Sequence, residues 1–447
     1  MSEMQKKSNE PKLSVLFFEN PSHMSSKTLE QHRSKTLRRL EGIRVKINGT
    51  YSIHSESNTD EVVLALKKAD PDLVLCSFTS WVEEYLPLRV LSSLDIPIFL
   101  WSIPKDTAHS LLSGITAAAS NLQQIGRTYF HVIGTEESDE IFQEIQGCTL
   151  AASLKRRAWG IQIGLFGQNC PGMMDVGGDD MALATLGPEV IRYELSDLME
   201  SYAHIPEDRA KRAVEEWMKV AGGSIEPDSE ELLRSARMYL ALKEKIETEG
   251  LEMVGVRCWP ELRSQFKVSP CLAFSSLMDQ GIMGICENDP TAGFTMWLLH
   301  HFSGKAVFLS DMGRMDQAKG TLSLSHCGLA SSSLAEDRSD VAIRKYVLDP
   351  EGGQCIEFRL KRGPVTLAKL MRPRGGTFSM FIARGESVVG PEHRGSVIYV
   401  KPDGGVDRFV SKMLQEGVEH HMVVGYGDLV TPLLRWCHMT RVRVFSP

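Results

Sequence analysis

Runs of apolar residues and amphipathic segments alternate along the first third of the chain. Four runs are apolar at nearly every position, at 12–21, 71–80, 96–104 and 128–135. Such runs are typical of strands that are buried on both faces of a parallel sheet. The segments between them, among them 25–42, are amphipathic and long enough for crossover helices. This alternation predicts a doubly wound α/β domain.

The next part of the chain repeats this alternation of apolar runs and amphipathic segments, which predicts a second α/β domain. A strand-like run at 159–167 leads into a glycine-rich turn. Two helices are predicted after it: one begins at Pro206 and stops at Gly222, and the other is capped by Asp228 and ends at Gly250. Three further strands and two intervening helices form a compact βαβαβ series, whose last strand is KAVFLSD.

After about residue 310 the pattern changes to period two. Apolar and polar residues alternate in QCIEFRLKR, SVIYVKP and TRVRVFS, which predicts antiparallel strands with one face in water. The expected fold is α/β, with two Rossmann-like (doubly wound) domains at 1–158 and 159–303. A β-rich, barrel-like C-terminal domain at 304–447 is expected to follow them.

The composition and charge argue against several classes of protein. The formal net charge is −7 and no long basic run occurs, which argues against nucleic acid or an anionic membrane surface as a partner. No stretch approaches the roughly 20 apolar residues that a membrane helix needs. The polar segment 1–12 lacks the apolar region of a secretory signal and is expected to be a short mobile tail. Nine cysteines without a C-x-x-C pair fit a reducing cytoplasm best.

Candidate chemistry gathers where the predicted strands end. Trp259 and Glu261 follow one strand, Glu287 follows the next, and Asp311 ends the third. Glu287 and Asp311 are separated by one helix and one strand, so neighbouring parallel strands would place them side by side. Two adjacent carboxylates repel each other unless one is protonated or a cation lies between them. Oxygen ligands suit Mn²⁺ or Mg²⁺, and an added imidazole favours Mn²⁺.

The residues also allow a purely structural interpretation. Imidazoles are available at His326, His420 and His421, but a histidine in a strand is more often an ordinary hydrogen-bonded residue than a ligand. Asp289 is placed to cap the helix that begins at Pro290. Spacing alone therefore leaves both interpretations open.

Other polar residues have simpler structural interpretations. His300 and His301 lie at the predicted end of a helix, where they would complement its dipole rather than bind a metal. Cys327 is expected to be a packing residue. The segment GLFGQNCPG lacks a full G-x-G-x-x-G before a helix, so a dinucleotide site is not expected.

Two segments carry a resemblance to a known family. The stretch CENDPTAGFTMWLLHHFSGKAVFLSD resembles the active-site region of L-fucose isomerases, with an E-N-D turn and a strand ending F-x-x-D. It is also similar to L-arabinose isomerases, although their ligand glutamate falls on Ser310 here. The segment EHHMVVGYGDL resembles the closing part of the fucose-type enzymes. The resemblance implies that Glu287, Asp311 and His421 bind Mn²⁺, or else Mg²⁺ or Co²⁺, with His326 as a fourth ligand of the arabinose type.

The function that this resemblance implies is metal-dependent aldose–ketose isomerisation. The enzyme would be an intramolecular oxidoreductase of carbohydrate metabolism that acts on a free or 6-substituted monosaccharide through an enediolate. Glu287 and Asp311 would form the proton shuttle. Trp259 would pack on the sugar or merely fill the core, and Glu261 would bind a sugar hydroxyl or merely cap the next segment. The second domain would carry the first metal ligand, and the C-terminal domain would complete the active site.

The resemblance also implies a homo-oligomer, a trimer, tetramer or hexamer, in which the segment 101–106 could reach a neighbouring subunit's pocket. Alternatives stay open. The same metal chemistry would serve a sugar epimerase or an aldolase-type lyase, and two α/β domains also describe a non-catalytic sugar-binding protein.

Overall fold

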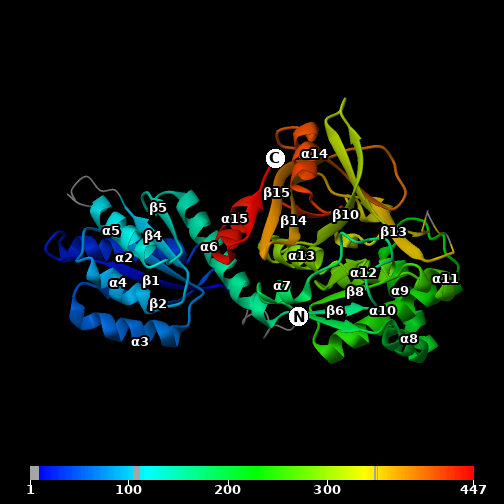
Figure 1. Cartoon of the computed structure of the whole chain (residues 1–447), viewed down its shortest axis with the longest axis horizontal. Helices are drawn as coiled ribbons and strands as arrows, with labels where there is room; N and C mark the ends of the chain where they lie inside the picture. The colour runs from blue at the N-terminus through cyan, green and yellow to red at the C-terminus, as the bar shows by residue number, and fades with distance from the viewer. Residues whose placement is uncertain (1–9, 104–110, 347–348, 350) are drawn as a thin grey trace. The chain divides into compact units, whose positions relative to one another are not determined.

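The computed structural model describes residues 10–103, 111–346, 349 and 351–447 (Figure 1). It divides into two compact units, Met1–Arg156 and Arg157–Pro447, which are considered separately. Residues 1–9 of the expected N-terminal tail lie outside the described residues, and so do residues 104–106 of the segment 101–106. No helix in the described part of the chain is long and apolar enough to span a membrane.

The first unit is built on a five-stranded parallel sheet in the order β2-β1-β3-β4-β5, the order of a doubly wound fold. The strands are β1 (Lys12–Phe18), β2 (Lys46–Ile53), β3 (Leu73–Phe78), β4 (Ile98–Ser102) and β5 (Tyr129–Ile133). The helices are α2 (Ser26–Leu40), α3 (Thr59–Ala69), α4 (Tyr85–Ser92), α5 (Leu111–Gln124) and α6 (Asp139–Arg157). The four strands predicted from apolar runs are confirmed.

Strand β2 was not predicted, and its position explains why. It lies at the edge of the sheet, and most of its residues are half-buried or exposed. Its sequence KINGTYSI therefore lacks the continuous apolar run on which the other predictions depend.

The second unit begins with a four-stranded parallel sheet in the order β7-β6-β8-β9. Its strands are β6 (Gln162–Phe166), β7 (Glu189–Tyr193), β8 (Met253–Val256) and β9 (Met283–Cys286). Its helices are α7 (Asp180–Ala184), α8 (Leu195–His204), α9 (Glu207–Val220), α10 (Ser229–Glu249), α11 (Glu261–Phe266), α12 (Cys271–Met278) and α13 (Pro290–Ser303). Helix α10 carries the expected capping box of Asp228 and Glu231 and ends at Gly250 in the left-handed conformation.

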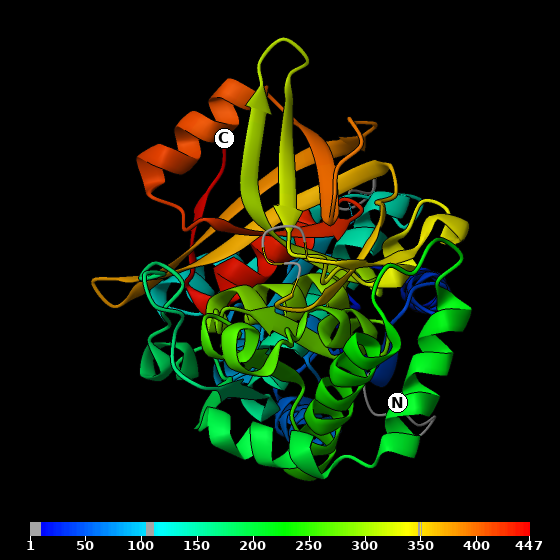
Figure 2. The same ribbon diagram turned by 90° about the vertical axis from the view of Figure 1, so that its right-hand side faces the viewer.

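The remaining strands form a nine-stranded mixed sheet in the order β12-β13-β16-β11-β10-β17-β14-β15-β18. An additional pairing of β16 with β15 joins β16, β11, β10, β17, β14 and β15 into a closed ring. The strands are β10 (Val307–Asp316), β11 (Thr321–His326), β12 (Ala342–Lys345), β13 (Gln354–Arg359), β14 (Gly363–Arg374), β15 (Thr377–Val388), β16 (Ser396–Pro402), β17 (His421–Tyr426) and β18 (Arg443–Phe445). In Figure 2, β10 and β11 stand as a hairpin beside α14 (Val406–Glu416). Helix α15 (Val430–Thr440) lies between β17 and β18 in the chain.

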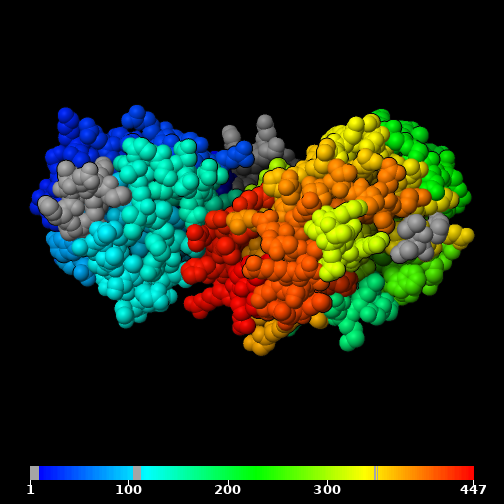
Figure 3. All heavy atoms as spheres, turned by 90° about the horizontal axis from the view of Figure 1, so that it is seen from above, coloured from blue at the N-terminus to red at the C-terminus, as the bar shows by residue number. Residues whose placement is uncertain are grey.

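Two expectations about this region are wrong. Strand β10 is not the last strand of the parallel series, because it pairs antiparallel with β11 and β17 in the mixed sheet. TRVRVFS contributes β18, which runs parallel to β15 rather than antiparallel. In both cases the local pattern of apolar residues predicts that a segment is a strand, but not which strand it pairs with. Figure 3 shows atoms of this C-terminal part, in orange, gathered on one face of the second unit.

Candidate active site

A strained turn after β9 positions Glu287. Glu287 and Asn288 have φ values of 60° and 58°, in the left-handed region that residues other than glycine rarely adopt. The fully buried Asn288 amide holds the turn, since its Nδ2 donates to the carbonyl oxygens of Phe166, Gly167 and Gln168 at 3.0–3.1 Å. These contacts tie the end of β9 to the end of β6. Backbone strain of this kind, held in place by its surroundings, is typical of functional sites.

Two strands of the mixed sheet bring a second carboxylate and an imidazole to this turn. Asp311 of β10 is the register partner of His421 of β17, so their side chains are neighbours across the ladder. His421 Nε2 lies 3.3 Å from Glu287 Oε2 and 3.6 Å from Asp311 Oδ1. Glu287 and Asp311 therefore do converge, but through an antiparallel pairing with β17 instead of neighbouring parallel strands.

His326, at the end of β11, faces the same place. Its Nε2 lies 3.9 Å from Asp311 Oδ1. The ligand atoms of Asp311, His326 and His421 all lie within 4.8 Å of one another, as do those of Glu287, His420 and His421. The structure thus brings together all four residues that the resemblance singles out.

Four converging atoms in this cluster lack a hydrogen-bond partner among the described residues. They are Glu287 Oε2, Asp311 Oδ1, His326 Nε2 and His421 Nε2, and all are buried. The 3.3 Å approach of His421 to Glu287 is too poorly aligned to count as a hydrogen bond. A buried polar atom left without a partner costs free energy, so four such atoms at one point fit a site that binds a ligand. Two carboxylates with imidazoles form a donor set that fits Mn²⁺.

The charges of the cluster act on each other strongly. Burial by itself would raise the pKa of Glu287, but its interactions with His420 and His421 and the charge of His326 lower that pKa well below its usual value. Burial alone would lower the pKa of His326, but the charges of Asp311 and Glu287 and the contact with Cys327 together raise that pKa above its usual value. Interaction with Glu287 and Asp175 raises the pKa of His420 to about 9. These pKa shifts indicate that the anionic carboxylates favour positive charge beside them. A bound cation would supply such a charge.

Asp289 has a larger role than the predicted helix cap. Its Oδ1 accepts the N–H of Ala292 at 2.9 Å and so caps α13 as expected. Its Oδ2 accepts from His421 Nδ1 at 2.9 Å and from Lys369 Nζ at 2.5 Å. With its proton on Nδ1, His421 presents the lone pair of Nε2 to Glu287 and Asp311. A carboxylate behind a histidine is the usual support of a metal-binding imidazole.

Sequence reasoning missed Lys369 and Asp175. Lys369 has a fully buried side chain on β14 and also donates to Thr291 Oγ1 at 2.9 Å. The signal was a single lysine within the apolar run VTLAKLM. Asp175 lies in the glycine-rich segment after β6, and its Oδ2 accepts from both the backbone N–H and Nδ1 of His420, at 3.1 and 2.8 Å. Nothing in the local sequence pointed to that contact.

The ring of His326 is held in a particular way. Its Nδ1 accepts the backbone N–H of Cys327 at 2.9 Å, so the neutral ring carries its proton on Nε2, the atom that faces Asp311. Direct metal binding by His326 would require the ring to turn or to lose that proton. The fourth-ligand assignment stays a prediction.

The two residues predicted to contact substrate lie at the end of β8. The side chain of Trp259 is 45% exposed and so does not fill the core. Glu261 begins α11 and accepts a hydrogen bond from Arg257 Nη2 at 2.8 Å. Contact of either side chain with a sugar stays a prediction.

His300 and His301 end α13 as predicted, but the dipole interpretation is wrong. Burial and the nearby charge of Arg157 lower the pKa of His301 to about 3, and burial also lowers the pKa of His300. Both rings are therefore neutral at physiological pH and bring no positive charge to the helix end.

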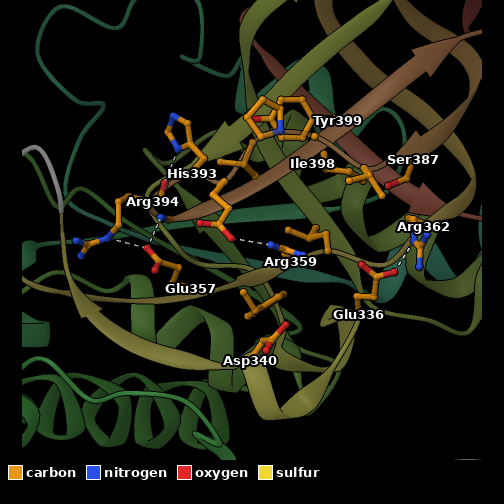
Figure 4. A pocket seen from close by; sticks show the side chains of 18 of the residues that line it. Glu336, Asp340, Glu357, Arg359, Arg362, Ser387, His393, Arg394, Ile398 and Tyr399 are labelled. Atoms are coloured by element: carbon orange, nitrogen blue, oxygen red, sulfur yellow. Dashed lines mark hydrogen bonds and ion pairs between the residues drawn. The ribbon is translucent and has the colours of Figure 1, made fainter. Parts of the chain in front are cut away.

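A surface cavity of about 630 Å³ lies elsewhere in the second unit (Figure 4). Its arginines are already paired: Arg359 with Glu392 at 2.8 Å, and Arg394 with Glu357 at 2.9 Å. None of the predicted site residues lines it.

Comparison with known proteins bears on the activity. No protein-family model matches the chain. A sulfoquinovose isomerase from Alkalicoccus urumqiensis is 23% identical over 367 residues, which cover 80% of this chain and 82% of that protein. The sulfoquinovose isomerase of Clostridium sp. (strain MSTE9) is 23% identical and covers 83% and 85%. That of Priestia aryabhattai is 21% identical and covers 81% and 82%.

These relatives indicate that the chain is an isomerase. Its reaction class is intramolecular oxidoreduction between an aldose and a ketose, so the predicted enzyme class is confirmed. Among solved structures, a periplasmic solute-binding protein of Actinobacillus succinogenes with bound D-allose aligns with 65% of this chain and 91% of its own length at 12% identity. Its TM-score of 0.18 is too low to indicate a shared fold.

Proposed function

We propose that this isomerase uses Mn²⁺ and a pair of carboxylates to interconvert a 6-substituted aldose and its ketose. The observation that supports the proposal most directly is the convergence of four buried, unpartnered atoms from Glu287, Asp311, His421 and His326 among the described residues. They come from strands of two different sheets, so their meeting is a product of the tertiary fold. Homo-oligomerisation and a cytoplasmic location are further parts of the proposal.

Glu287, Asp311 and His421 would hold the ion, with His326 beside them. When bound there, Mn²⁺ supplies Lewis-acid stabilisation of the negative charge that builds on the sugar oxygens during proton abstraction. Asp289 and Lys369 would keep His421 oriented.

The carboxylates would move the proton. The lowered pKa of Glu287 keeps it ionised near neutral pH, as a base that accepts a carbon-bound proton must be. The side chain of Asp311 is 40% exposed, and its Oδ1 lies 3.6 Å from His421 Nε2. An ionised carboxylate of the pair would take the proton from carbon 2, and a proton would then return from the pair to carbon 1 of the enediolate, while the proton of the carbon-2 hydroxyl passes to the oxygen on carbon 1. Both carboxylates then regain their starting protonation states, and the same groups serve the reverse reaction.

The substrate follows from the relatives. They are named for sulfoquinovose, a hexose with a sulfonate on carbon 6, so we propose a 6-substituted hexose of this type as substrate.

The test is Mn²⁺-dependent exchange at carbon 2. Protein stripped with a chelator is restored with Mn²⁺ and supplied with pentoses, 6-deoxyhexoses and sulfoquinovose in D₂O. We expect ketose formation and deuterium uptake that depend on the metal. Both should fall at least about 1,000-fold in Glu287→Gln and Asp311→Asn, because loss of general base catalysis alone costs on the order of 10²–10⁴-fold. Glu392→Gln, at an 87% exposed carboxylate, is the matched control. Full activity without metal, or in both site variants, would refute the mechanism.

A further inference from the structure

A second group of polar atoms next to Glu287 also lacks partners. Arg257 Nε, Glu261 Oε2 and Asn169 Oδ1 are buried and find no hydrogen-bond partner among the described residues. The metal cluster does not use them. They follow β8, the neighbour of β9, and β6, the next strand beyond it in the sheet. Ligands of open α/β sheets bind at this carboxyl edge.

The strand register places Arg257 and Glu287 at the same edge of the sheet. Val256 of β8 pairs with Cys286 of β9, so Arg257 and Glu287 are the first residues after two neighbouring strands. The Arg257 N–H donates to the Phe166 carbonyl at 3.0 Å, the same oxygen that accepts from Asn288. The thiol of Cys170 lies within electrostatic reach of both charged groups: burial is the main cause that raises its pKa to about 12, and to that net value Glu287 contributes a rise and Arg257 a decrease.

The guanidinium is held in place but not enclosed. Glu261 Oε1 accepts from Arg257 Nη2 at 2.8 Å, and the two side chains remain 21% and 32% exposed. Gly167 makes room for it, because a Cβ there would lie 3.2 Å from Arg257 Cβ and 3.5 Å from Nε. Gly167 also has a φ of 80°, so a side chain at this position would be both strained and crowded. The partly exposed Trp259 lies between the two residues in sequence.

We propose that Arg257 is a specificity-determining residue that binds an anionic oxygen group at the end of the sugar remote from carbon 1. This inference rests on the proposed function. A guanidinium has five donors, and Glu261 leaves most of them available to a tetrahedral oxyanion. The unpartnered Glu261 Oε2 then accepts from a neighbouring sugar hydroxyl. The side-chain pair thus recognises an anionic oxygen next to a hydroxyl, as a hexose with a sulfonate or a phosphate on carbon 6 presents.

The alternative is that Arg257 serves only to hold Glu261 and the start of α11. These roles predict different kinetics. A residue that only supports the fold lowers turnover of charged and uncharged sugars alike, whereas a residue that binds the anion changes their ratio.

The experiment measures kcat and KM of the Mn²⁺-loaded enzyme with sulfoquinovose, glucose 6-phosphate and glucose. In Arg257→Gln, we expect kcat/KM for the preferred anionic sugar to fall about 10- to 100-fold more than for glucose, mainly through KM, since a hydrogen bond to a charged group contributes about 1.5–3 kcal/mol. The ratio of kcat/KM for the anionic sugar to that for glucose in Arg257→Lys should lie between the ratios of the wild type and Arg257→Gln. Lysine keeps the charge but loses the planar, bidentate donor geometry of the guanidinium. The kcat/KM values for sulfoquinovose and glucose 6-phosphate show whether the site prefers a sulfonate or a phosphate.

The matched control is Arg359→Gln, an arginine 61% exposed in the separate cavity of Figure 4, which should leave the ratio as in the wild type. An equal loss on all three sugars, or an unchanged ratio in Arg257→Gln, overturns the inference while leaving the isomerase standing. If no aldose is turned over, the proposed function fails. Calorimetric binding of sulfoquinovose to wild type and Arg257→Gln then still decides the role of Arg257: equal affinity overturns it and a weakened affinity supports it.

Discussion

At the scale of single residues, the buried pair of Lys369 and Asp289 decides how the site is held. Both side chains are at most 1% exposed, and their 2.5 Å contact lies directly behind His421. Burial alone would raise the pKa of Asp289, but the charge of Lys369 and the contact with His421 keep that pKa well below its usual value. Such a pair costs desolvation when the protein folds, so its value lies in orienting the imidazole rather than in stability.

Replacing Lys369 with Met should therefore damage both stability and metal binding. The change leaves the Asp289 charge buried without compensation, and we expect a loss of about 3–5 kcal/mol in the free energy of unfolding. Mn²⁺ affinity should fall roughly 10- to 100-fold as His421 loses its orientation. Urea unfolding and calorimetric titration with Mn²⁺ measure the two effects. Lys319→Met, at a 66% exposed lysine, is the control. Wild-type Mn²⁺ affinity in Lys369→Met would contradict the role of the pair.

At the scale of elements, the helix α13 joins the two parts of the site, and its two ends differ. Its first turn is capped by Asp289, so the helix and the His421 support share one carboxylate. Its last turn ends at Gly304 and carries His301, whose ring Nδ1 contacts the Trp297 carbonyl oxygen at 2.9 Å. Since burial holds His301 neutral, the C-terminal end of the helix is a pH-sensitive point of the fold.

The sign of this effect follows from the two pKa values of His301. The folded pKa of about 3 lies below the ordinary value of 6.5, so the unfolded chain binds the proton more readily. Stability is thus fully present above pH 6.5 and is lost progressively as the pH falls toward 3. Between pH 7 and pH 5 we expect the wild type to lose about 2 kcal/mol more than His301→Asn, measured by urea unfolding. Parallel pH profiles of the two proteins would contradict this prediction.

At the scale of the whole molecule, the proposed site belongs entirely to the second compact unit, Arg157–Pro447. Its ligands come from the parallel sheet through Glu287 and from the mixed sheet through Asp311 and His421. A cation at this point would link the two sheets of one unit. Binding to the folded state alone stabilises it by mass action.

We therefore expect Mn²⁺ to raise the melting temperature of the second unit. At a free concentration of about 100 times Kd, the gain is about 2.7 kcal/mol, or roughly 5 °C for a unit of this size. Differential scanning calorimetry of chelated and Mn²⁺-loaded protein measures the shift, and the double variant Asp311→Asn/His421→Gln should abolish it. A shift of equal size in the double variant would place the bound metal elsewhere.

The sequence by itself determined the elements that follow from local patterns. Continuous apolar runs predicted β1, β3, β4 and β5, because strands buried on both faces need apolar side chains at every position. Cap residues predicted the bounds of α10 at Asp228 and Gly250, because helix ends must satisfy their own backbone groups. Carboxylates at strand ends, together with a family resemblance, pointed to Glu287, Asp311, His326 and His421.

Only the tertiary structure decided which of these residues meet and by what route. Asp311 reaches Glu287 because β10 pairs with β17, across more than a hundred residues of chain, and no local pattern encodes that pairing. Lys369 contacts Asp289 across 80 residues, and Asp175 contacts His420 across 245. Residue types and spacing indicate what chemistry a segment can supply. The partners of a buried charge depend on the long-range packing of strands, and so they become visible only in the folded chain.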